Sequence, residues 1–108
     1  YEKIFPALAR SSIKQVSLEC VHSHVPPQLM ALLEGKDVMV GVIDVASDQV
    51  ETPEEVAETI GLALQYVPRE HLIACTNCGL APMDREVAWK KLQALAQGAA
   101  LARQRQAA

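Results

Sequence analysis

The segment from Asp37 to Asp44, DVMVGVID, carries no polar side chain between its two aspartates. A strand with one face in water alternates apolar and polar residues, whereas a strand buried on both faces is apolar throughout. The segment from His71 to Cys75, HLIAC, has the same character. Burial on both faces is typical of parallel strands covered by helices, so these two segments predict a parallel sheet.

Helical patterns separate the expected strands. Thr52, Pro53 and Glu55 supply an N-cap, a first-turn proline and the partner of a capping box. An apolar stripe follows at helical spacing and ends before Pro68: Val56, Ile60, Ala63, Leu64 and Val67. A short helix is expected in residues 26–36, and YEKIFPALAR resembles the end of an earlier helix. The last helix is expected from its N-cap Asp84 to about Arg103, with one buried side: Ala88, Leu92, Leu95, Ala96, Ala99 and Ala102.

With QVSLE (residues 15–19) as the first strand, the order is strand, helix, strand, helix, strand, helix. Right-handed crossovers turn this order into three parallel β/α units. Three strands alone leave two open edges and one uncovered face, and a full barrel needs about 250 residues. The expected fold is therefore α/β, the C-terminal three β/α units of a (β/α)₈ TIM barrel, with residues 1–108 as one segment of a single barrel domain.

Composition excludes several classes of protein. The net charge of −3 argues against a nucleic-acid footprint, which needs clustered Lys and Arg. No apolar run approaches the roughly 18 residues of a membrane span, and no signal peptide is visible, so a cytoplasmic protein is expected. Three cysteines, Cys20, Cys75 and Cys78, are an odd number, which favours reduced thiols or metal ligands over a disulfide scaffold.

Strand alternation predicts polar residues at one edge of the sheet. Val16 and Leu18 share one face and Ser17 and Glu19 the other. Asp44 is in phase with Val40 and Val42, and Cys78 is in phase with Ala74 and Thr76, which puts Cys75 on the opposite face. The C-terminal edge of parallel strands is where sites are built. The first and third strands lie about 10 Å apart. Glu19 and Cys78 leaning inward can therefore share a zinc ion.

The pair Cys75 and Cys78 allows other readings. A thioredoxin-like redox pair needs its first cysteine at a helix N-terminus, whereas Cys75 ends an expected strand. We expect Cys75 to be a buried structural thiol. For Cys78, the residues alone leave a metal ligand and a small packing residue equally open. Trp89, on the last helix, is expected to be a packing residue.

Taken together, Glu19, the strand GVID, the helix start VETPEEVA and the motif NCGL resemble the C-terminal part of the cobalamin-independent methionine synthase family. The resemblance runs from QVSLE through the last helix. Its most specific elements are Glu19 and, 59 positions later, Cys78 within TNCGL, with GVIDVASDQVETPEEV between them. These elements are far more specific together than any one of them alone.

The resemblance implies a (β/α)₈ barrel in which zinc activates the thiol of homocysteine for methyl transfer from a methyltetrahydrofolate. Glu19 and Cys78 match the glutamate and the final cysteine of the zinc site. The other two ligands, a His-x-Cys motif, would lie upstream of Tyr1, so the partners implied are the two substrates and the remainder of the barrel or a second chain. Ala46 stands where longer members carry a histidine thought to donate a proton.

His22, His24 and Asp44 are the candidate substrate-binding residues at the same edge, and the two histidines are also candidates to replace the missing zinc ligands. Two other functions stay open. One is a zinc-dependent thiol alkyltransferase similar to the epoxyalkane:coenzyme M transferases. The other is a non-catalytic barrel fragment that acts through self-association or a partner.

Overall fold

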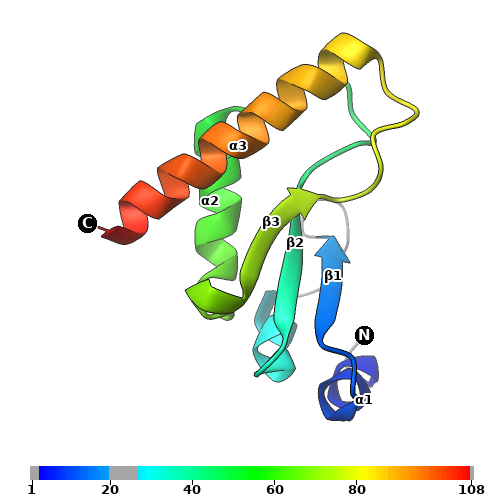
Figure 1. The fold of residues 1–108 in the computed structure, drawn as a ribbon, viewed down its shortest axis with the longest axis vertical. Helices are drawn as coiled ribbons and strands as arrows, with labels where there is room; N and C mark the ends of the chain where they lie inside the picture. Colours follow the sequence, from blue (N-terminus) through cyan, green and yellow to red (C-terminus); the bar gives the residue numbers. More distant parts are fainter. Residues whose placement is uncertain (1–2, 20–26, 108) are drawn as a thin grey trace.

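Three parallel strands form one sheet in a computed structural model that describes residues 3–19 and 27–107. Strands β1 (Gln15–Glu19), β2 (Asp37–Ile43) and β3 (Leu72–Thr76) lie in the order β1-β2-β3, with β2 in the middle (Figure 1). The predicted parallel α/β fold is confirmed. All three strands therefore end at the same edge of the sheet.

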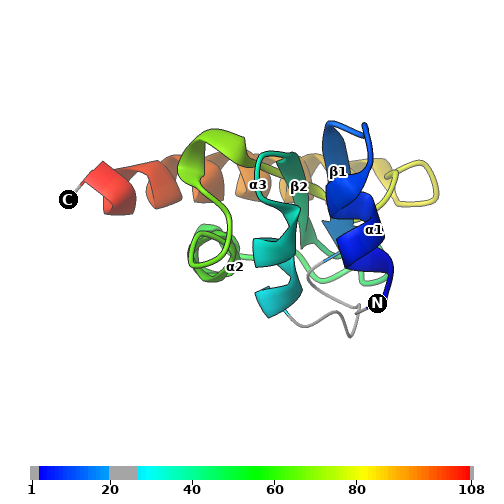
Figure 2. The ribbon, with the colours of Figure 1, turned by 90° about the horizontal axis from the view of Figure 1, so that it is seen from below.

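Five helical segments connect and flank these strands: α1 (Ile4–Arg10), the 3₁₀ helix η1 (Pro27–Leu33), α2 (Pro53–Ala63), the 3₁₀ helix η2 (Arg69–His71) and α3 (Arg85–Ala107). The element order is the predicted one, although the short helix after β1 is a 3₁₀ helix and α3 extends to Ala107. Figure 2 shows α1, η1 and α2 on one side of the sheet. Among the residues that the structure describes, no helix is long and apolar enough to cross a membrane.

The two faces of the sheet differ sharply in chemistry. Residues that pair across parallel strands share a face. One face carries Val38 and Val40, which belong to the hydrophobic core together with apolar residues of α2, and four partly buried residues that pack against that core: Val16, Leu18, Leu72 and Ala74. The other face carries Ser17, Glu19, Met39, Gly41, Ile73 and Cys75. The second face is the one that lines the interior when such a sheet closes into a barrel.

Helix α2 begins as its sequence predicts. The Thr52 hydroxyl accepts a hydrogen bond from the backbone N–H of Glu55 at 3.1 Å and donates to the Glu55 carboxylate at 3.2 Å. The first bond is the N-cap half of the predicted capping box and satisfies one backbone donor of the first turn, whereas the Glu55 carboxylate binds the Thr52 hydroxyl and not a backbone N–H. The face of α2 predicted to be buried is turned to the core through Val56, Ala57, Ile60 and Ala63. The cap and the apolar stripe therefore fix both where α2 starts and how it is rotated.

Helix α3 turns only part of its predicted face to the core: Ala102 is buried and Leu95 and Ala99 pack against the core, but the helix is rotated from the predicted orientation. Its buried residues are Lys91, Ala94, Gly98 and Ala102, whereas Leu92 is 40% exposed. Trp89 is 63% exposed, so the prediction that it is a packing residue is wrong for the chain as described. The physical reason lies in α2, because Gly98 packs so closely against it that a Cβ atom there would come within 2.4 Å of the Val56 side chain. Close approach at Gly98 and burial of Lys91 set this rotation.

Candidate functional site

Glu19 ends β1 at the C-terminal edge, on the face of the sheet opposite the core. It pairs in register with Gly41 of β2, and Gly41 pairs with Cys75 of β3. Side chains at one level of a parallel sheet share a face, so Glu19 and Cys75 point to the same side. Between them the middle strand contributes no side chain. The Glu19 side chain is exposed on this face, as predicted from strand alternation.

The gap above Gly41 is occupied by the chain that follows β3. A Cβ atom on Gly41 would lie 2.8 Å from the Cα of Asn77 and 2.9 Å from its Cβ, closer than real Cβ atoms approach. The Asn77 N–H donates to the carbonyl of Ile43 at 2.9 Å. The chain after β3 therefore crosses over the end of β2 on the face that Glu19 shares. Only glycine at position 41 leaves room for this crossing.

Cys78 follows directly on this crossing and is an exposed, free thiol. The Thr76 hydroxyl donates to the Cys78 carbonyl at 2.8 Å, which holds the turn. The strand alternation used to place Cys78 does not apply, because β3 ends at Thr76 and its pairing with β2 is irregular between Gly41 and Ile43. Cys78 lies at the edge because the backbone crosses β2, and not because of its position in the alternation of β3.

Cys75 is half-buried on the face shared with Glu19, so it is less enclosed than the predicted structural thiol. Burial raises the pKa of the Cys75 thiol, and a hydrogen bond with the Ser17 side chain lowers the pKa by less. Ser17 belongs to β1 and Cys75 to β3, with β2 between them.

Asp44 lies at the edge, immediately after β2, and is 8% exposed. Its carboxylate accepts a hydrogen bond from the N–H of Ala46 at 2.8 Å, and its own N–H donates to the Glu51 carboxylate at 2.7 Å. These bonds shape the loop between β2 and α2. Binding of a substrate by Asp44 remains a prediction.

Lys91 is the polar residue of this edge that sequence reasoning missed. Its side chain is fully buried, and its Nζ atom donates to the carbonyls of Asp44 and Gln49 at 2.8 Å and to the Glu51 carboxylate at 2.9 Å. A lysine within a helix usually lies at the surface, and its partners are 40 or more positions away. Nothing in the local sequence indicates such a contact.

Two of the predicted zinc ligands lie within the described residues. Glu19 and Cys78 belong to one edge, but residues 3–19 and 27–107 contain no group of three or more His, Cys, Asp or Glu side chains that could hold a metal ion. His22 and His24 lie outside the described residues. The candidate zinc site thus consists of one carboxylate and one thiol, a donor pair that suits zinc.

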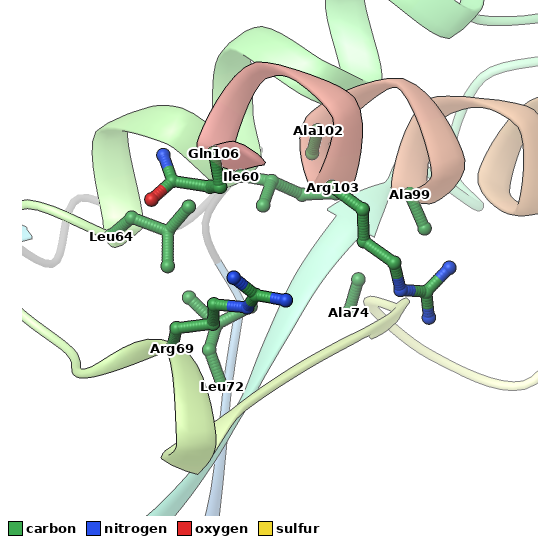
Figure 3. Close-up of a pocket in the computed structure, with 9 residues that line it drawn as sticks. All are labelled: Ile60, Leu64, Arg69, Leu72, Ala74, Ala99, Ala102, Arg103 and Gln106. Atoms are coloured by element: carbon green, nitrogen blue, oxygen red, sulfur yellow. The ribbon is translucent and has the colours of Figure 1, made fainter. Parts of the chain in front are cut away.

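A cavity of about 260 Å³ lies elsewhere, between α2, η2, β3 and α3. Its floor is apolar, and Arg69 of η2 and Arg103 of α3 stand at its wall (Figure 3). Leu72, the first residue of β3, lines it, so the cavity belongs to the opposite end of the strands from Glu19. It contains none of the predicted site residues.

Comparison with known proteins identifies the family. Residues 1–101 match the family model described as the catalytic domain of cobalamin-independent synthase. The chain belongs to this cobalamin-independent synthase family. The family predicted from Glu19, GVID, VETPEEVA and NCGL is thereby confirmed.

Members of the cobalamin-independent synthase family with similar sequences include curated proteins named methionine synthase. That of Sulfurisphaera tokodaii is 30% identical over 104 residues, which cover 96% of this chain and 31% of the relative. That of Thermococcus kodakarensis is 40% identical over 63 residues, 58% of this chain and 19% of the relative. This chain thus spans about a third of the length of the relatives it matches along most of its sequence.

A solved structure from the cobalamin-independent synthase family supports the fold. The B12-independent methionine synthase of Shewanella sp. W3-18-1, determined in complex with selenomethionine, superposes with a TM-score of 0.93 at 50% identity. The superposition covers 97% of this chain and 31% of that one. The three β/α units are accordingly part of a barrel, as the sequence predicted.

Proposed function

We propose that this chain forms the zinc-site part of a barrel that transfers a methyl group from a methyltetrahydrofolate to the thiol of homocysteine, giving methionine. Its membership of the cobalamin-independent synthase family supports the reaction class. The relatives named methionine synthase favour this acceptor over the thiol of coenzyme M. No observation on the described residues favours the coenzyme M alternative or a non-catalytic role.

The observation that carries the proposal is the backbone crossing at Gly41. It leads the chain from β3 over the middle strand, on the face of Glu19, and Cys78 is the next residue after the crossing. The carboxylate that ends β1 and the thiol that follows β3, two strands that are not neighbours, are thereby brought to one edge. Both side chains are exposed at this edge.

Glu19 and Cys78 would hold the ion through a carboxylate oxygen and a thiolate sulfur. Bound zinc keeps a substrate thiol ionised at neutral pH, which makes the sulfur a nucleophile. Catalytic zinc sites use three protein ligands and leave a position for substrate. The described residues supply two ligands, so the remainder of the barrel would complete the set, and His22 and His24 are the candidates within this chain.

The loop after β2 would form part of the substrate pocket. Asp44 fixes its first turn, and Ala46, whose N–H it binds, stands where longer family members carry a histidine. A methyl side chain cannot donate a proton, so a proton at this point would have to come from water or another residue. We place the protein in the cytoplasm, where a free thiol such as that of Cys78 stays reduced.

Metal content measured on the chain together with the remainder of the barrel tests the proposal. We expect zinc, or Co²⁺ with its thiolate absorption band, to bind the complete barrel and to bind at least about 10-fold more weakly after Cys78→Ala or Glu19→Gln. Cys75→Ala is the matched control, because Cys75 lies three residues from Cys78 and is not a proposed ligand. Equal metal binding by the Cys78→Ala variant and the parent chain would show that the zinc assignment is wrong.

A further inference from the structure

We propose that Lys91 and Glu51 are positioning residues that hold Cys78 in place through the loop after β2. This inference rests on the proposed function, since it concerns the placement of one of the two proposed zinc ligands. It assigns no contact with the metal or a substrate to either residue. It adds a role for α3, a helix that supplies no candidate ligand.

The first step is the burial of Lys91. Its side chain has no exposed surface, and all three hydrogen bonds of its Nζ atom end on residues 44–51: two carbonyls and the Glu51 carboxylate. Burying an ion pair is costly, and an apolar pair of similar size often stabilises a core equally well. An apolar pair, however, could not donate hydrogen bonds to the carbonyls of Asp44 and Gln49 and so could not fix the direction in which they point.

The second step runs through Glu51. One carboxylate oxygen binds Lys91, and the other accepts the N–H of Asp44 at 2.7 Å. The Nζ atom of Lys91 donates a hydrogen bond to the Asp44 carbonyl. Both backbone groups of Asp44 are therefore held by the same ion pair. The chain is fixed at the point where it leaves β2.

The third step joins this loop to the segment after β3. The N–H of Val45, next to Asp44, donates to the side-chain oxygen of Asn77 at 3.1 Å. The N–H of Asn77 donates to the carbonyl of Ile43 at 2.9 Å. Asn77 is thus hydrogen-bonded to Ile43 and Val45, the two neighbours of Asp44 in the chain. The residue after Asn77 is Cys78. A continuous set of hydrogen bonds runs from Lys91 on α3 to the backbone beside Cys78.

The test uses Lys91→Met and Glu51→Gln in the full chain, with Lys90→Met as the matched control because Lys90 is an exposed neighbour on the same helix. Amide hydrogen exchange is followed at Val45, Asn77 and Val40, the last being a buried residue of β2. Affinity for Co²⁺ is measured on the same variants in the complete barrel. Glu51→Gln, which keeps an acceptor for Lys91, serves if Lys91→Met does not fold.

We expect exchange at Val45 and Asn77 to accelerate about 10-fold or more with exchange at Val40 unchanged, because the opening is local. Affinity for Co²⁺ should fall about 10-fold, as for other residues that orient metal ligands. A uniform acceleration at all three amides would show that the pair only stabilises the fold, and would overturn the proposal. So would unchanged exchange at Asn77, or an equal effect of Lys90→Met.

The two proposals fail in different ways. A complete barrel that binds no Co²⁺ contradicts the zinc site, and exchange at Val45 and Asn77 then decides the positioning role alone. Unaltered Co²⁺ affinity in a variant with accelerated exchange contradicts the positioning of Cys78 while leaving the zinc site intact.

Discussion

Gly41 carries the tightest constraint of any single residue at the candidate site. Gly41→Ala would place a methyl group 2.8 Å from the Asn77 Cα atom, and backbone cannot yield as a flexible side chain can. We expect the free energy of unfolding to fall by about 1–3 kcal/mol. Urea unfolding followed by circular dichroism measures this loss, and the amide shifts of Asn77 and Cys78 should move.

Gly79→Ala is the control for this substitution. Gly79 lies one residue beyond Cys78, and an added Cβ atom there meets nothing within 4 Å. We expect a change within about 0.5 kcal/mol, as for most surface substitutions. Equal losses at the two glycines would contradict the crossing of the chain over β2.

The two described thiols should differ in reactivity. Burial raises the pKa of Cys75, whereas Cys78 is exposed, and only the thiolate is alkylated. At pH 8, iodoacetamide should therefore modify Cys78 well before Cys75, as peptide mass spectrometry would record. Faster modification of Cys75 in the native chain would show that its burial is misjudged.

The same burial makes stability depend on pH. The pKa of Cys75 is higher in the folded chain than in the unfolded chain, so burial of the neutral thiol contributes to the free energy of unfolding. This contribution is complete below the ordinary thiol pKa and is lost as pH rises through the raised value. Between about pH 8 and pH 10, the parent chain should lose more thermal stability than Cys75→Ala. Parallel melting temperatures across this range would contradict the assignment.

At the scale of elements, the contact between α2 and α3 depends on Gly98. Alanine in place of glycine normally stabilises a helix interior by about 0.5–1 kcal/mol. At Gly98 the added Cβ would come within 2.4 Å of the Val56 side chain and 3.0 Å of the Pro53 carbonyl. We therefore expect Gly98→Ala to destabilise the chain by about 1–3 kcal/mol.

Gly61→Ala in α2 should change the stability in the opposite direction, toward a more stable fold. Gly61 is inside the helix, and nothing lies within 4 Å of an added Cβ atom. Here the usual gain of about 0.5–1 kcal/mol should appear in thermal melts. A gain at both glycines would mean that α2 and α3 are farther apart than described.

The orientation of α3 shows what hydrophobic pattern cannot predict. Pattern places Leu92 inside because leucine is apolar, yet Leu92 is 40% exposed and Lys91 is buried. The ion pair with Glu51 and the close packing of Gly98 decide the rotation, and both depend on residues some 40 positions earlier. For α2, whose cap and stripe are local features, the same reasoning was right.

For the whole molecule, the sequence predicted the order of elements and the parallel sheet because each strand and helix carries its own local pattern. It also placed Glu19 correctly, since alternation holds inside β1. It could not place Cys78 by alternation, because β3 stops at Thr76 and the chain then crosses β2. Contacts between distant segments, such as that of Val45 with Asn77, have no counterpart in a local pattern.

Lys91 also bears on the order in which the molecule assembles. It joins the loop after β2 across 40 positions of chain, so the loop is completed only when the last helix docks. While the chain is being synthesised, the three strands can pair before the pocket they will frame has a fixed shape. Lys91→Met should therefore leave the refolding rate nearly unchanged, because the strands meet before Lys91 reaches the loop.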